Sequence, residues 1–121
     1  MVKSLLSEAE ELEFVRKLAL IPHKSWTRNE ICSPGSMIPW AIRYYADVFD
    51  GKNTNTFGIE HDRGRGEYQA HFNFRITMGK NYRSVRNEIR RQFESLERRY
   101  SVNYREKQRD WLKYIMPRIT P

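Results

Sequence analysis

The sequence reads Glu67-Tyr68-Gln69-Ala70-His71-Phe72-Asn73-Phe74-Arg75-Ile76-Thr77-Met78 near its middle, and apolar and polar residues alternate through these twelve positions. A period of two is typical of a strand with one face in a core and the other toward solvent. We therefore predict one long strand over 67–78, with its aromatic and aliphatic side chains buried and its polar side chains exposed.

A partner strand is predicted just before it, over residues 56–61. The segment 62–66 between the two contains an aspartate and two glycines, which suit a tight hairpin turn. This turn places position 61 opposite 68 and position 71 opposite 58. His61 and His71 then lie apart, and because a metal ion needs converging ligands, we predict no metal site.

Two helices are expected before the hairpin. Ser7 and Glu10 form a capping box at the start of a helix over 8–20, which Pro22 ends. Residues 22–36 are interpreted as irregular because they contain Pro22, Pro34 and Gly35. Ser36 is interpreted as the cap of a second helix, which ends at Gly51.

Two more helices are expected after the hairpin. Apolar residues from Tyr82 to Tyr100 recur at spacings of three and four, which indicates an amphipathic helix. Residues 101–103 are interpreted as a break, and a last helix ends at Pro117. The predicted fold class is therefore α+β, with two N-terminal helices, a long antiparallel β-hairpin and two C-terminal helices in a single domain over 1–121.

The hairpin alone is too small a sheet to be stable, because a two-stranded hairpin is marginal in water. The long arm over 67–78 has no further strand beside it in this interpretation, so its outer edge is free. We therefore predict a homodimer in which a second copy completes the sheet.

The charge of the chain is strongly basic and unevenly placed. Lys and Arg number 22 against 15 Asp and Glu, a net charge of +7, and residues 61–121 alone carry +8. A basic half beside a neutral half points to a polyanionic partner, of which nucleic acid is the commonest. No apolar run approaches the roughly 20 residues of a membrane span, so no membrane partner is expected. The single cysteine, Cys32, is compatible with a reducing, cytoplasmic setting.

The polar face of the predicted strand is one candidate binding surface. Its amides, hydroxyl and guanidinium suit phosphates and sugar hydroxyls, which are the groups read on double-stranded RNA; an ordinary solvated face is the alternative interpretation. The candidate residues on this face are Gln69, His71, Asn73, Arg75 and Thr77.

The start of the following helix is a second candidate surface. Helix N-termini usually carry acids, but this one carries Lys80, Arg83 and Arg86, with Arg90 one turn further on. Cations at this end are unfavourable unless an anion is bound, because the helix dipole is positive there. We therefore predict a phosphate site at this junction. No cofactor and no catalytic residue are predicted.

Two families are similar to parts of the chain. The hairpin followed by a helix with tyrosines resembles rolling-circle replication initiators, which nick DNA with a helix tyrosine and a metal held by two histidines. Here His71-Phe72-Asn73 lacks the second histidine. A nicking endonuclease that uses a helix tyrosine stays an alternative, with Tyr100, Tyr104 and Tyr114 as the candidate nucleophiles.

The second likeness is to tombusvirus-type suppressors of RNA silencing. The order of elements resembles the C-terminal part of these viral proteins. Helices come first, then Ile76-Thr77 at a strand end, a turn at Gly79, and Arg83-Ser84 at the start of a long helix. The resemblance implies a small dimeric protein that holds double-stranded RNA on a sheet, with Trp26 in the place of a residue that stacks on duplex ends. We therefore expect a non-catalytic protein that binds nucleic acid by backbone and shape, with duplex RNA favoured. A basic protein-interaction module is the other alternative.

Overall fold

The computed structural model describes residues 6–73, 75–78 and 82–119, with backbone alone for 75–78, 112 and 114–119. The chain begins with helix α1, followed by the short 3₁₀ helix η1, five strands and one long helix, α2. The elements are α1 (Glu8–Leu18), η1 (His23–Ser25), β1 (Thr27–Cys32), β2 (Pro39–Phe49), β3 (Thr54–Asp62), β4 (Glu67–Phe72), β5 (Arg75–Met78) and α2 (Arg83–Ile119). The predicted α+β class is confirmed.

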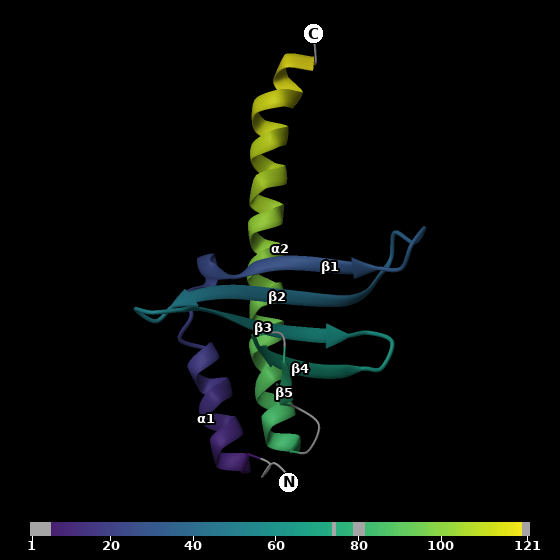
Figure 1. Ribbon diagram of the computed structural model, residues 1–121. Coiled ribbons are helices and arrows are strands. Elements are labelled where there is room, and N and C mark those ends of the chain that lie inside the picture. Colours follow the sequence, from purple (N-terminus) through teal and green to yellow (C-terminus); the bar gives the residue numbers. More distant parts are fainter. Residues whose placement is uncertain (1–5, 74, 79–81, 120–121) are drawn as a thin grey trace.

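The five strands form one antiparallel sheet in the order β1-β2-β3-β4-β5. Both helices pack on the same face, which we call the inner face, and the opposite, outer face carries no helix (Figure 1). Helix α2 runs across the strands from the β4–β5 side toward β1, and its C-terminal part extends beyond the sheet. None of the described helices is long and apolar enough to cross a membrane.

The core lies between the inner face and the two helices. Helix α2 contributes a stripe at the predicted spacing, and α1 contributes Val15 and Leu18. The aromatic residue Phe14 of α1 packs against Phe57 and Phe72 of the sheet, with ring centroids 6.1 Å apart in both pairs. The buried core cluster is Val15, Leu18, Ile42, Tyr44, Ile59, Ala70, Val85, Ile89, Phe93 and Leu96.

Several predicted local features are confirmed. Helix α1 begins with the predicted capping box, in which Ser7 and Glu10 bond to each other's backbone N–H groups. The predicted hairpin register is also confirmed, since His61 pairs with Tyr68 and Gly58 pairs with His71. These features depend on short-range chemistry that the sequence carries within a few residues.

The predicted second helix is wrong, because residues 39–49 form strand β2. Alternate side chains at Ile42, Tyr44 and Ala46 are buried, which is the period of a strand. β-branched and aromatic residues such as Ile42 and Tyr44 favour this pleated, half-buried setting. The hydroxyl of Ser36, the expected helix cap, instead accepts from the N–H of Ile38. The segment interpreted as irregular likewise contains strand β1, which pairs with β2.

The predicted single strand over 67–78 is also wrong, because it folds back on itself. Asn73 lies in a turn with φ of 48°, and β5 returns antiparallel beside β4. The backbone N–H of Asn73 donates to the Thr56 carbonyl, and its side-chain oxygen accepts from the Thr56 N–H, each at 2.8 Å. The backbone and side chain of Asn73 thus end β4 in the middle of the predicted twelve-residue strand.

The two predicted C-terminal helices are one helix. Helix α2 continues through residues 101–103 without interruption and is 37 residues long. The structure therefore has two α-helices where four were predicted. The side chains of residues 98–111 and of Lys113 are exposed, and this part of the helix extends beyond the sheet.

Replacing Asn73 tests the turn that divides the predicted strand. We expect Asn73→Ala to lower the free energy of unfolding by about 2 kcal/mol, because it loses a backbone-pairing acceptor and puts alanine at positive φ. Asn73→Asp keeps both the acceptor and the tolerance of positive φ, so it stays within about 0.5 kcal/mol of the parent. Urea denaturation measures both values, and equal stability of all three proteins would contradict this role for Asn73.

Candidate nucleic-acid interface

The polar face of the predicted strand is not the exposed row that was expected. Gln69 and His71 lie on the outer face of the sheet but are each only 8% exposed. Asn73 is engaged in the turn with Thr56. Arg75 and Thr77 belong to β5, a separate strand, so the five candidates do not form one continuous line.

Strands β2, β3 and β4 share a hydrogen-bonded network on the outer face. Glu60 accepts from Arg43 Nη2 at 2.6 Å, and its other carboxylate oxygen lies 3.2 Å from His71 Nε2. Arg43 also donates to the hydroxyl of Tyr45 at 2.6 Å. His71 and Arg43 together hold the pKa of Glu60 below its usual range, against the opposing effect of burial. These polar groups therefore bind one another across the sheet.

The outer face also has the wrong charge for phosphate. Strand alternation and register place one arginine, Arg43, on this face of β2–β4. The carboxylates on the same face are Asp47, Glu60, Asp62 and Glu67. A surface with four carboxylates and one cation repels a polyanion.

The positive charge is concentrated on α2 instead. This helix contains eleven Lys and Arg residues against five Asp and Glu, a net charge of +6 out of the +7 of the whole chain. Within the described part of the chain, eight of its cations are exposed and form no ion pair. They are Arg83, Arg86, Arg98, Arg99, Arg105, Lys107, Arg109 and Lys113.

A buried contact with β1 fixes the middle of α2 on the sheet. Arg28 of β1 donates to Glu97 of α2 at 2.7 Å, and the hydroxyl of Tyr44 donates to the same carboxylate. Burial alone would raise the pKa of Glu97, but hydrogen bonds from Arg28 and Tyr44 hold it below its usual range. The Arg28 guanidinium also lies over the ring of Tyr100, 4.2 Å from its centroid. This contact orients the face of α2 that carries the arginines away from the sheet.

The predicted site at the start of α2 is partly assembled. A recess of about 600 Å³ separates the beginning of β4 from the first turns of α2. Gln69, Arg83, Arg86 and Arg90 all line it, so four of the predicted residues meet there. The first turn of α2 contains no acid, as predicted. Lys80 lies outside the described residues.

Trp26 lies at the end of η1 and is half-buried. It packs against the core cluster and lines a small pocket between η1 and α2. Only part of its ring is therefore available to a partner.

The arrangement expected for a DNA-nicking centre is not assembled in the described residues. His61 and His71 lie on opposite faces, because His61 stacks on Tyr68 with centroids 4.2 Å apart on the inner face. Burial, and then the nearby Arg63, lowers the pKa of His61. Across the described residues, no three His, Cys, Asp or Glu side chains are grouped to hold a metal ion. Tyr100 and Tyr104 lie exposed on α2.

Three exposed arginines of the second half of α2 were not assigned to a surface from the sequence. They are Arg99, Arg105 and Arg109. The sequence feature that pointed to them was the excess of arginine after residue 61. Their arrangement on one surface follows only from the continuous helix α2.

Comparisons with protein-family models, with curated proteins and with solved structures returned no match.

Replacing Glu60 tests the network on the outer face. Because the pKa of Glu60 is lowered in the folded protein, the stability it contributes is present above the unfolded value of 4.5 and is lost as the pH falls through the folded pKa. We expect Glu60→Gln to cost about 2 kcal/mol at pH 7, because it leaves Arg43 without its buried partner. The difference in free energy of unfolding between Glu60→Gln and the parent is expected to become smaller toward pH 3.

Asp47→Asn is the matched control, since Asp47 is an exposed carboxylate on the same face. Urea denaturation of the parent and both variants at pH 7 and pH 3 gives the six free energies of unfolding. A Glu60→Gln protein as stable as the parent at pH 7 would contradict the proposed network.

Proposed function

We propose that this protein binds nucleic acid through its phosphate backbone, without catalysing a reaction on it, and that α2 is the binding element. One observation carries the proposal: in the described part of α2, eight exposed cations without an ion pair lie along the helix, whereas the outer face of β2–β4 is acidic. The interface is thus assigned to α2, whose start was one of the two predicted surfaces, and not to the polar face of the sheet, which was the other.

The geometry of α2 suits a regular polyanion. A helix of 37 residues is about 55 Å long. Arg98 and Arg105 are seven residues apart, which puts them on one face about 10.5 Å apart, and Arg109 follows about one turn after Arg105. A rigid helix keeps these cations at fixed spacing, and arginine pairs with phosphate in a bidentate manner. A duplex, whose phosphates are also regularly spaced, matches such a row better than a flexible strand.

Duplex RNA is the preferred ligand in this proposal. The preference over DNA is supported by the likeness of residues 76–84 and the long helix after them to tombusvirus-type silencing suppressors. Suppression of RNA silencing by sequestering duplexes is the corresponding biological role.

We also propose that the protein is a homodimer. The strand from which a free edge was predicted, β4, has β3 on one side and pairs with β5 over residues 70–72 on the other, so half of that edge is covered. Strand β1 is the edge that fits this role, because six residues of backbone lie there without a second strand in the described chain. Light scattering at tens of micromolar is expected to give twice the monomer mass, and a strict monomer would overturn this part of the proposal.

Removing cations from α2 tests the binding element. In the parent, affinity for a 20-bp RNA duplex is expected to fall about a thousandfold between 50 and 200 mM salt, as for about six phosphate contacts. The triple change Arg105→Ala, Arg109→Ala, Lys113→Ala is expected to weaken binding at least tenfold. The triple change is also expected to reduce the slope of log affinity against log salt concentration by about 3. Fluorescence anisotropy with duplex RNA, duplex DNA and single strands measures these effects.

The matched control removes three exposed cations from the rest of the chain, at Arg16, Lys24 and Lys52. It lowers the net charge equally but leaves α2 intact, so its affinity is expected to stay within about threefold of the parent. Equal losses in the two triple variants would contradict a specific role for α2. An affinity that does not change with salt would overturn nucleic-acid binding and favour a basic protein-interaction module.

A further inference from the structure

Three aromatic side chains lie exposed on the second half of α2. Tyr100 is 40% exposed, and Tyr104 and Trp111 are each 52% exposed. With about 100° of rotation per residue, the three positions fall within about 40° of one another around the helix. We call them the aromatic row. The row continues the side of α2 that carries the buried Phe93 and Leu96, beyond the point where the sheet ends (Figure 1).

The end of the row nearest the sheet is already a stack. The guanidinium of Arg28 lies over the ring of Tyr100, 4.2 Å from its centroid. The rings of Tyr100 and Tyr104 are stacked, with 6.2 Å between their centroids and 27° between their planes. Beyond Tyr104, none of the described elements covers the row. Flat groups can therefore be added to the stack from solvent.

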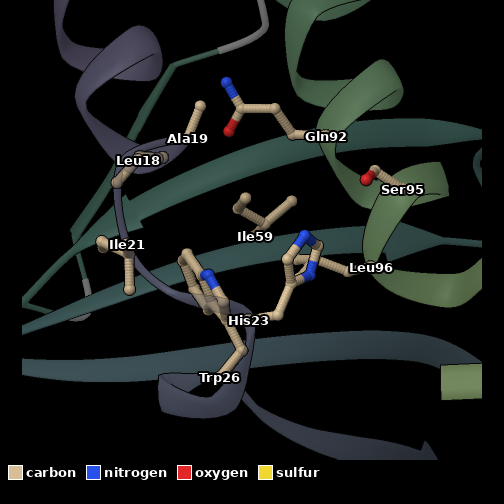
Figure 2. Close-up of a pocket in the computed structure, with 9 residues that line it drawn as sticks. All are labelled: Leu18, Ala19, Ile21, His23, Trp26, Ile59, Gln92, Ser95 and Leu96. Carbon is tan, nitrogen blue, oxygen red and sulfur yellow. The ribbon is translucent and has the colours of Figure 1, made fainter. Parts of the chain in front are cut away.

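Exposure distinguishes Trp111 from the tryptophan that was selected from the sequence. Trp26 lies in the small pocket beside α2, among apolar side chains such as Leu18 and Ile59 (Figure 2). Trp111 lies on the part of α2 that extends past the sheet, and half of its surface is accessible. Of these two rings, the one available for stacking is that of Trp111.

The charge around the row indicates which kind of partner fits it. Residues 98–113 contain six Lys and Arg and two Asp and Glu, a net charge of +4. One of these cations, Lys107, lies on the row itself, between Tyr104 and Trp111. A second α2 laid along this face would bring the same charge against it, whereas a polyanion is attracted. Aromatic rings among cations are typical of surfaces that bind single-stranded nucleic acid.

We propose that the aromatic row binds unpaired nucleotides that adjoin the duplex held by α2, with bases stacked on Tyr104 and Trp111 and phosphates on the neighbouring cations. This inference deepens the proposed nucleic-acid binding and rests on it for the class of ligand. Bases within a duplex are stacked on one another, so the row selects bases that are unpaired and splayed out. Little sequence preference is expected, because every base has a π face.

The spacing of the two outer rings determines the length of the unpaired segment. Tyr104 and Trp111 are seven residues apart, which is about 10.5 Å along the helix axis. Successive nucleotides of a stacked strand are about 3.4 Å apart. About three nucleotide steps therefore separate the bases that reach the two rings, and a segment of about four nucleotides is the shortest that reaches both.

Fluorescence anisotropy of the full chain with three RNA ligands tests the row. The ligands are a blunt 20-bp duplex, the same duplex with five unpaired adenosines at one end, and the same duplex with five abasic nucleotides there. The two extensions carry the same phosphates, so a difference between them measures the bases. The adenosine extension is expected to bind at least tenfold more tightly than the abasic one. Replacing both outer rings, Tyr104→Ala with Trp111→Ala, is expected to remove this difference and leave blunt-duplex affinity within about twofold.

Two control variants show whether the π faces are responsible. Tyr104→Phe with Trp111→Phe keeps both rings and is expected to bind all three ligands as the parent does. Phe49→Ala removes a ring from β2 that is 68% exposed, and it is expected to leave the difference between the extensions unchanged. Light scattering of the parent and of the double alanine variant compares their oligomeric states.

The results separate this inference from the proposed function. Equal affinity for the adenosine and abasic extensions, or a double alanine variant that keeps the difference, would overturn the row as a binding surface. Duplex binding that depends on Arg105, Arg109 and Lys113 would still stand in that case. A dimeric parent with a monomeric double alanine variant would assign the row to a second copy and also overturn the inference. A base-dependent gain that disappears with the two rings supports the row even if the triple change in α2 leaves duplex binding unaltered.

Discussion

The packing of one apolar stripe of α2 against the sheet determines which side chains of this helix face solvent. Val85, Ile89, Phe93 and Leu96 are nearly inaccessible to solvent against the inner face. Because these positions occupy one side of the helix, the exposed arginines lie on its flanks and on its opposite side. Burial of the stripe therefore produces the cationic surface as a geometric consequence.

The edge strand β1 depends on the same helix. Its pairing with β2 leaves its other edge uncovered, and the contact of Arg28 with Glu97 ties it to α2 at the point where the helix leaves the sheet. Arg28 is well buried, and two hydrogen-bond donors satisfy the Glu97 carboxylate. Such a pair is costly to break from one side, because the remaining charge is left buried. The first half of α2 is thus anchored and its second half is free to contact a partner.

The parts of the fold that were predicted from sequence are those with local signals. The capping box at Ser7, the register of His61 and His71, and the stripe of α2 each depend on residues a few positions apart. Strand β2 was missed because its apolar residues also fit a helical spacing. Pairing with β1 and β3 favours the strand over the helix. The turn at Asn73 was missed because the alternation continues through it, whereas its φ and its bonds to Thr56 interrupt the strand.

The candidate interface was selected from the sequence at the start of α2, but also on the outer face of the sheet, and not along the second half of the helix. An excess of arginine after residue 61 indicates a polyanion partner, but sequence does not tell which side chains neutralise one another. On the outer face Glu60 binds both Arg43 and His71, so polar residues that suited RNA are engaged across the sheet. On α2, by contrast, the cations outnumber the acids that could pair with them, so cationic charge is left for a partner.

An NMR titration of the ¹⁵N-labelled protein with a 20-bp RNA duplex tests the central claim most directly. Arginine Nε and backbone amide signals report which surface meets the ligand. We predict that the signals of α2 from Arg83 to Lys113 shift or broaden while those of Arg43, Gln69 and His71 on the outer face stay in place. Shifts confined to the outer face of β2–β4, with α2 unchanged, would contradict the assignment of the interface to the helix.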